Sequence, residues 1–432
     1  VWISNQAGNN GVLFGDLNVR AVKDKNDNII SDGRPSLGFT GNMDTYKPAE
    51  GSATRSDIAI TDPDFKYPSL WKSNIAADYK FGDGWVATVE LLYSKDINAI
   101  YHDNIGLYRT EQFVNDGGAG NARPYYNGYY SDREGNQKAA NHVVMLRNTS
   151  KGHSLYTTFQ LQKNFVDGIL KGLYLNGSYS FGQSRGVTDG TSSVATSAWK
   201  YRAALDGNAE EVGYTAGSFD GRLLLSASYT ANWSKYAATS FGLIYQRYRP
   251  FRYSYCYNGD ANGDSQFSND LMYIPANFDE VKDHLLPGDF DSQEDAWKAM
   301  NAFIEQDPYL SKHRGEYAER NGAVAPFANQ LDLSVSHDIK IYQKNGRSHT
   351  LRFSFNIANF LNLLNRNWGV VQTTVLGNQQ YQFLTIPKGQ GPSAANNYTL
   401  KYTMAKDLDE TFKDNLNDVS RWQMQFGIKY IF

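Results

Sequence analysis

Apolar and polar residues alternate along most of this chain, most clearly over the stretch 422–432. Its apolar side chains are Trp422, Met424, Phe426, Ile428, Tyr430 and Phe432. The positions between them are polar or small, with Ile431 as the one exception. Successive side chains of a β-strand point to opposite faces, so a period of two indicates a strand with one apolar face. The pattern therefore predicts a strand that runs to residue 432.

The same alternation recurs upstream, in segments of about ten residues. These segments lie at 71–81, 85–93, 155–165, 173–181, 223–233, 331–341 and 351–357. A strand of about 9–11 residues, tilted in a bilayer, spans the hydrocarbon core. Counting down and up strands from residue 69 gives about 11–12, with 367–406 the hardest region to register. The predicted fold class is all-β, a transmembrane antiparallel β-barrel.

The connections between these segments differ systematically in length. Short turns are expected at 82–84, 166–168, 234–236 and 344–346, and long loops at about 108–138, 186–220 and 255–329. Outer-membrane barrels have short periplasmic turns on one side and long extracellular loops on the other. We therefore expect residues 69–432 to form barrel strands with long extracellular loops. Residues 1–68 are expected to form an extracellular segment rich in loops, with at most one strand, near 12–22.

One helix is predicted inside the longest loop. Ser292 can cap its N-terminus, and acidic residues follow in the first turn. Ala296, Met300, Phe303 and Ile304 then repeat at helical spacing, and Asp307-Pro308 ends the helix. We expect this helix to pack over other loop residues.

Composition supports the barrel and excludes several other classes. Aromatic residues make up 14% of the chain, the net charge is −3 and there is one cysteine. A single cysteine excludes an internal disulfide framework and CxxC metal chemistry. The near-neutral charge gives no case for nucleic acid, and no apolar run reaches the length of a membrane-spanning helix. HExxH and phosphate-loop motifs are absent from the sequence, and no enzymatic activity and no cofactor is predicted.

One cluster carries a weak signal for a calcium site. Asp260, Asn262 and Asp264 match positions 1, 3 and 5 of an EF-hand loop. The match then fails, because Ser265 replaces the usual glycine and Asp270 comes one place early. The alternative is a loop of local Asx turns without a metal. A second charged stretch, 313–320, is expected to be a solvated loop.

Aromatic residues near the predicted strand ends are candidates for the membrane interface. Such rings suit the headgroup region, because they are apolar with a polar edge. We expect these residues to contact lipid or lipopolysaccharide, or to serve in barrel assembly. They are Trp71, Trp85, Trp233, Trp422, Phe426, Tyr430 and Phe432.

Several long segments resemble the barrel of the Oar-like TonB-dependent receptors of Bacteroidetes. They are 71–81, 84–99, 307–315, 317–332, 355–369 and 421–432. The resemblance implies a multi-pass outer-membrane receptor with a 22-stranded barrel, an N-terminal plug and a TonB box. This chain would supply the C-terminal half of the barrel, and the plug, TonB box and other barrel half would lie in a missing N-terminal part. The resemblance also implies import of a scarce or bulky solute, and a terminal strand read by the outer-membrane assembly machinery.

Two other functions remain open on the sequence alone. The first is a self-contained passive porin of about 12–16 strands. The second is a secreted β-rich protein that binds glycans, although an apolar terminal strand would aggregate in water. No pattern of residues specifies the solute. The loop at 255–329 is the expected lid or contact surface, because it is the longest.

Overall fold

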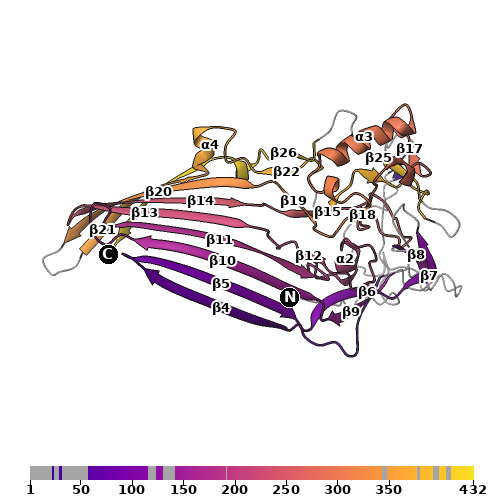
Figure 1. Ribbon diagram of the computed structural model, residues 1–432, viewed down its shortest axis with the longest axis horizontal. Coiled ribbons are helices and arrows are strands. Elements are labelled where there is room, and N and C mark those ends of the chain that lie inside the picture. The colour runs from indigo at the N-terminus through magenta and orange to yellow at the C-terminus, as the bar shows by residue number, and fades with distance from the viewer. Residues whose placement is uncertain are drawn as a thin grey trace.

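The computed structural model describes residues 22–23, 29–31, 57–114, 123–129, 142–190, 192–342, 348–376, 380–392, 398–404 and 410–432. This part of the chain is mostly β-structure, dominated by one large antiparallel sheet (Figure 1). Within it, no helix is long and apolar enough to span a membrane.

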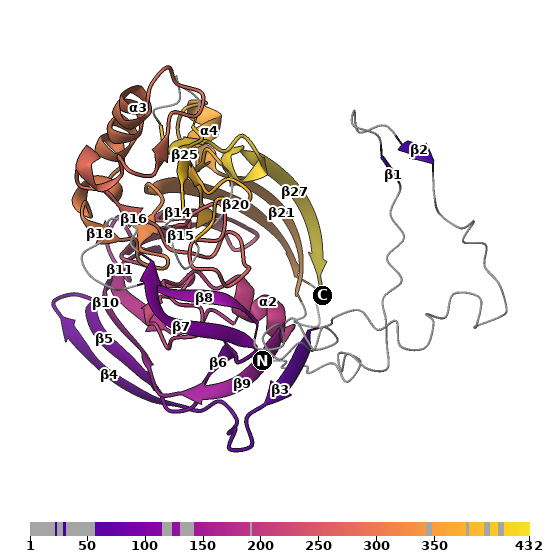
Figure 2. The ribbon, with the colours of Figure 1, turned by 90° about the vertical axis from the view of Figure 1, so that its right-hand side faces the viewer.

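The large sheet is built from long strands that follow one another up and down. Their spatial order is β27-β21-β20-β14-β13-β11-β10-β5-β4, and the short strand β12 (Gly213–Tyr214) also pairs with β11. Seen end-on, the sheet curves into an open arc from β4 round to β27 (Figure 2). The long strands are β4 (Leu70–Phe81), β5 (Trp85–Asp96), β10 (Gly152–Asn164), β11 (Leu173–Gly186), β13 (Arg222–Ser234), β14 (Ala237–Tyr248), β20 (Ala328–Tyr342), β21 (Ser348–Ala358) and β27 (Gln423–Ile431). Each predicted segment of alternation is confirmed as one of these strands.

The register places all the alternating apolar residues on one face. Ala227 pairs with Leu243, which pairs with Leu333, which pairs with Ile357 across four neighbouring strands. Odd-numbered residues lie on this face in the long strands from β4 to β21. In β27 the even-numbered residues lie on it, because Met424 pairs with Ile357. The sheet therefore has an apolar face and an opposite polar face over its full width.

The connections are sorted by length between the two ends of the sheet, as predicted. Short connections join β4 to β5, β10 to β11, β13 to β14 and β20 to β21, and the first three lie at the left in Figure 1. The turn expected at 344–346 falls outside the described residues. Long connections span 97–151, 187–221, 249–327 and 359–422, and most of their labelled elements gather at the right. The first is longer than expected, and the fourth was not foreseen as a long loop.

That fourth connection corrects the strand count. Within the described residues the large sheet has nine long strands, fewer than the 11–12 expected. The region 367–406 instead contributes short strands to small sheets among the long connections. They are β22 (Gln372–Thr374), β23 (Gln380–Tyr381), β24 (Leu384–Thr385) and β25 (Leu400–Tyr402).

Residues 1–68 also differ from expectation. The described part of this segment contains three short strands, β1 (Val22–Lys23), β2 (Ile29–Ser31) and β3 (Ile58–Thr61), where at most one was predicted. The strand expected near 12–22 falls outside the described residues except for Val22, which begins β1.

The described parts of the four long connections pack together, and we call them the loop assembly. Its strands pair mostly within a single connection, whereas two parallel pairs join the third connection to the fourth: β15 (Arg252–Tyr255) with β23, and β17 (Leu285–Leu286) with β25. Its helices include α2 (Ala195–Lys200), α4 (Phe360–Leu364), η1 (Phe278–Glu280), η2 (Leu310–Lys312) and η3 (Asp418–Ser420). Its remaining strands are β6 (Ala99–Asn104), β7 (Leu107–Val114), β8 (Arg123–Tyr129), β9 (Val143–Thr149), β15 (Arg252–Tyr255), β16 (Tyr273–Ile274), β17 (Leu285–Leu286), β18 (Glu316–Tyr317), β19 (Ala323–Val324) and β26 (Phe412–Asp414).

The predicted helix is confirmed as α3 (Gln293–Gln306). The Ser292 side chain accepts a hydrogen bond from the Asp295 amide at 3.1 Å, which satisfies a donor that the first turn leaves free. The four residues expected on its apolar face, Ala296, Met300, Phe303 and Ile304, are all buried.

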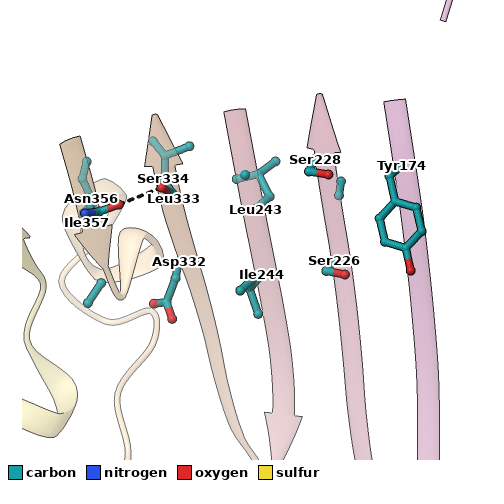
Figure 3. A pocket seen from close by; sticks show the side chains of 13 residues that line it. Tyr174, Ser226, Ser228, Leu243, Ile244, Asp332, Leu333, Ser334, Asn356 and Ile357 are labelled. Carbon is teal, nitrogen blue, oxygen red and sulfur yellow. Dashed lines mark hydrogen bonds between the residues drawn. The ribbon is translucent and has the colours of Figure 1, made fainter. Parts of the chain in front are cut away.

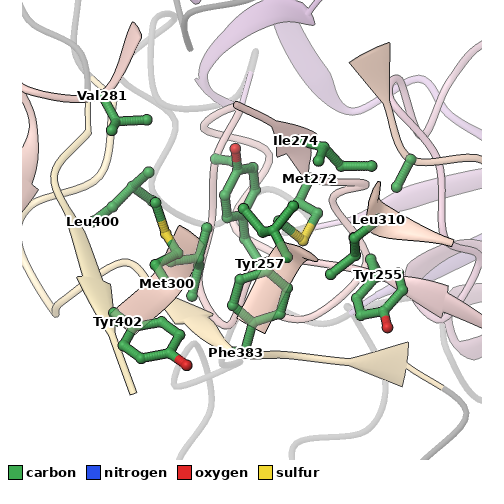
Figure 4. Packing of buried hydrophobic residues seen from close by; sticks show 14 of the residues in the cluster. Tyr255, Tyr257, Met272, Ile274, Val281, Met300, Leu310, Phe383, Leu400 and Tyr402 are labelled. Atoms are coloured by element: carbon green, nitrogen blue, oxygen red, sulfur yellow. The ribbon is translucent and has the colours of Figure 1, made fainter. Parts of the chain in front are cut away.

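The main hydrophobic core lies in the loop assembly (Figure 4). It combines tyrosines of β15 with Phe303 of α3 and with residues of the fourth connection, such as Phe383 and Leu400. The ring centroids of Tyr255 and Phe383 are 5.9 Å apart, in an edge-to-face contact. Long loops usually lack a core of their own. This core therefore gives the loop assembly a fixed shape.

Candidate functional site

The apolar face of the large sheet is open to the surroundings. Ile75 of β4 is 69% exposed, and Phe426 and Ile428 of β27 are 76% and 74% exposed. Soluble monomers rarely expose contiguous apolar patches larger than a few hundred Å². An apolar surface that continues over the whole sheet marks a face for interaction with a membrane or with another protein.

Most of the predicted interface aromatics lie at the ends of the strands. Trp85, Trp233, Tyr430 and Phe432 lie at the end with the short connections, and Trp71 and Trp422 at the opposite end. The Trp233 indole donates a hydrogen bond to Thr239 Oγ1 at 2.8 Å, and the Tyr430 hydroxyl is 2.6 Å from His349 Nδ1. Phe426 differs, because it lies mid-strand and pairs with Phe355. Rings with a polar edge thus mark both borders of the apolar face.

The polar face carries small and hydrogen-bonding side chains. Figure 3 shows a shallow hollow of about 430 Å³ over β13, β14, β20 and β21, where Ser334 donates a hydrogen bond to Asn356 at 2.7 Å. Nearer the short connections, Arg352 binds Asp338 through two hydrogen bonds of 2.6 and 2.8 Å. The residues that line the hollow include Tyr174, Ser226, Ser228, Gly242, Ile244 and Asp332. This face can contact water or a polar solute at little cost.

The acidic loop predicted as a calcium candidate is held by its own backbone. The Asp260 carboxylate accepts hydrogen bonds from the amides of Asn262, Gly263 and Ser265, at 3.1, 2.6 and 2.8 Å. Asp264 accepts one from the Gln266 amide at 2.8 Å. These contacts are Asx-type turns, as in the metal-free alternative.

Charge is concentrated in this loop. Burial raises the pKa of Asp264 well above its usual range, and the nearby Asp270 and Asp260 raise it further. In the part of the chain that the structure describes, no group of three or more His, Cys, Asp or Glu residues is arranged to hold a metal ion. Calcium binding by Asp260, Asn262, Asp264 and Asp270 stays a prediction.

Asp270 has a partner that the sequence did not reveal. Its carboxylate lies 3.2 Å from the Arg123 guanidinium, and both side chains are buried. Arg123 also donates to the Leu271 carbonyl and lies over the rings of Tyr257 and Tyr317, 5.6 Å from each centroid. Because Arg123 belongs to the first long connection and Asp270 to the third, the ion pair ties these two segments together.

Asp307 forms a second polar centre of the loop assembly. Its carboxylate accepts hydrogen bonds from the hydroxyls of Tyr255 and Thr411, at 2.6 and 2.7 Å. It also accepts from the amides of Tyr309 and Leu310, at 2.9 and 2.8 Å. The sequence identified Asp307 only as the end of a helix. Its tertiary partners come from segments with no recognisable motif.

The charged stretch 313–320 was expected to be solvated, and for Arg320 this is wrong. Its side chain is buried among main-chain carbonyls of residues 186, 187 and 213. A buried arginine outside any motif is a functional candidate that sequence reasoning missed.

Similarity to known proteins adds no further information about this site. Comparison of the chain with protein-family models, with curated proteins and with solved structures gives no match.

Proposed function

We propose that this chain forms part of the barrel wall, and the external loops, of an outer-membrane receptor of the TonB-dependent type that imports a bulky or scarce solute. The single observation that carries the proposal is the large sheet. It combines a continuous exposed apolar face, a polar opposite face and connections sorted by length. A transmembrane barrel needs this combination, because its strands face lipid on one side and water on the other.

The strand lengths and the interface aromatics support the same proposal. The long strands run from 9 to 15 residues, long enough to cross a bilayer when tilted. Tryptophan and tyrosine at both ends of the apolar face match the two headgroup layers. In this arrangement the long connections lie outside the cell and the short ones in the periplasm.

The two edge strands of the sheet bear on how the barrel is closed. Within the described residues, β4 and β27 each pair with one long strand. Unpaired strand edges are not tolerated in lipid. We therefore propose that further strands close the barrel, and the family resemblance implies that a plug and a TonB box act together with it.

The packed core of the loop assembly favours a receptor over a passive pore. A fixed external structure can present a binding surface, whereas passive diffusion needs only an open channel. Single-channel recording of the chain alone separates the two functions: a steady open conductance would identify a porin. Solubility without detergent would indicate the secreted glycan-binding alternative.

Cysteine labelling tests the proposed topology directly. The native cysteine, Cys256, is fully buried, so we expect the unmodified chain not to react with a membrane-impermeant maleimide. We expect Phe267→Cys, in a long connection, to react on intact cells. Ile169→Cys, in a short connection, should react only after the outer membrane is permeabilised. Both side chains are exposed, so equal labelling of the two variants on intact cells would contradict the topology.

The terminal strand provides a second test. Phe432 is 91% exposed on the apolar face and stacks on Tyr430 at 6.0 Å. Replacing Phe432 with lysine should lower the yield of protein in the outer membrane several-fold, because a charge replaces a lipid-facing ring in the strand proposed to guide assembly. The matched control is Ile431→Lys, on the polar face of the same strand. Equal yields for the two variants would rule out this role.

A further inference from the structure

Two arginines are buried beside a polar pocket inside the loop assembly. Arg202 and Arg320 are 6% and 3% exposed. The pocket has a volume of about 280 Å³ and is also lined by Tyr201, Ser254, Asn321 and Gln380. These residues come from three of the four long connections, so the pocket exists only when the loop assembly is formed.

Both guanidinium groups are held by main-chain carbonyls. Arg202 donates to the carbonyls of Ala209 and Val187, at 3.0 and 3.3 Å, and to that of Gly207. Arg320 donates to the carbonyls of residues 186, 187 and 213, and therefore shares Val187 with Arg202. All the hydrogen-bond partners found for the two groups in the described part of the chain are carbonyls, and the buried Nε–H of each has none.

Two like charges this close, without a bonded carboxylate, are costly to bury. Burial, and next the neighbouring Arg320, lowers the pKa of Arg202 to about 10. Burial is likewise the main cause that lowers the pKa of Arg320. Both groups still carry a positive charge at neutral pH. Both arginines line the pocket, where low-dielectric walls strengthen the attraction of a positive charge for an anion.

Three carboxylates act electrostatically on the two arginines, but the hydrogen bonds found for them in the described part of the chain go to other groups. Asp189, exposed at the pocket, accepts hydrogen bonds from Asn321 Nδ2 at 3.0 Å and from the Ala216 amide at 2.9 Å. Glu211 accepts one from the Leu205 amide at 2.8 Å. Asp206, which also acts on Arg202, is paired with Arg109 at 3.3 Å. Lys200 adds a further positive charge, 5.4 Å from the centre of the Tyr201 ring.

We propose that this pocket binds an oxyanion, a carboxylate or phosphate group carried by the solute. The two buried guanidinium groups supply the attractive charge, and the Gln380 amide and the Tyr201 hydroxyl supply hydrogen-bond donors at the pocket. The inference deepens the proposed receptor function, on which it rests for the idea that the ligand is a transported solute. It narrows that solute to an anionic class.

Calorimetric titration of the full chain in detergent tests the site with two probes, inorganic phosphate and acetate. We expect saturable binding of at least one, and the stronger probe identifies the source of the oxyanion. Arg320→Gln should weaken binding about tenfold, the size of one lost charge-assisted contact. Because Arg320 also holds loop carbonyls, this variant could disturb the fold, and a second variant is needed.

Asp189→Asn is that second variant, because it removes an exposed negative charge and should strengthen binding several-fold. Opposite shifts in the two variants support the site. The proposal would be overturned if neither probe bound, or if both variants bound the probes with unchanged affinity. It would also be overturned if the cation tetramethylammonium bound as tightly as the anions. The measurement needs no membrane, so its failure is distinct from a failure of the labelling test, which concerns the receptor topology.

Discussion

Leu243→Arg should prevent stable insertion of this chain in the outer membrane, whereas Ile244→Arg should have little effect. The two residues are neighbours near the middle of β14, are similarly exposed and lie on opposite faces of the sheet. An arginine at the bilayer midplane of a barrel costs about 2–4 kcal/mol, whereas on the polar face it meets water and small side chains. The yield of folded protein in purified outer membranes, together with urea unfolding in lipid vesicles, measures the difference.

The comparison is informative because a soluble sheet predicts a different outcome. In water, an exposed leucine and an exposed isoleucine on one strand should both tolerate arginine within about 0.5 kcal/mol. Equal behaviour of Leu243→Arg and Ile244→Arg would therefore refute a lipid-facing apolar surface.

Removing Arg123 should destabilise the loop assembly by about 3–5 kcal/mol, because Arg123→Met leaves the buried Asp270 carboxylate without its charged partner. Hydrogen exchange measured on β8 and β15 reports the loss locally, as faster exchange in the loop assembly with unchanged protection in the large sheet.

Two further variants separate charge from packing. The double variant Arg123→Met, Asp270→Leu should recover much of the lost stability, because neither charge is then buried unpaired. Arg109→Met removes an ion pair to Asp206 whose arginine is half exposed, and should cost less than about 1 kcal/mol. If Arg109→Met and Arg123→Met have equal effects, burial of the Arg123–Asp270 pair is not the source of its stability.

The large sheet was predictable because its signal is local. Alternation of side chains such as Leu331, Leu333 and Val335 reports one face of a strand without knowledge of its partners. The helix α3 was predictable for the same reason, since its cap and its apolar stripe lie within fifteen residues. The region 367–406 was not, because strands of two or three residues carry no measurable period.

The pocket residues could not be found from sequence, because burial of a charge depends on distant segments. Arg320 lies in a stretch that is rich in charge, and nothing next to it indicates that carbonyls from residues 186, 187 and 213 will surround it. The pairing of Arg123 with Asp270 likewise joins positions that share no motif. Polar groups of this kind are identified only after the loops are placed in space.

The parallel pairing of β15 with β23 has a consequence for the order of folding. Ser254 aligns with Gln380, so the centre of the loop core cannot form until the fourth long connection is available. Half of the neighbouring strand pairs of the large sheet need no such wait, because short turns join them into four hairpins. We therefore expect the four hairpins of the large sheet to form first and the loop assembly to close last, in one cooperative step that refolding kinetics would show as a separate slow phase.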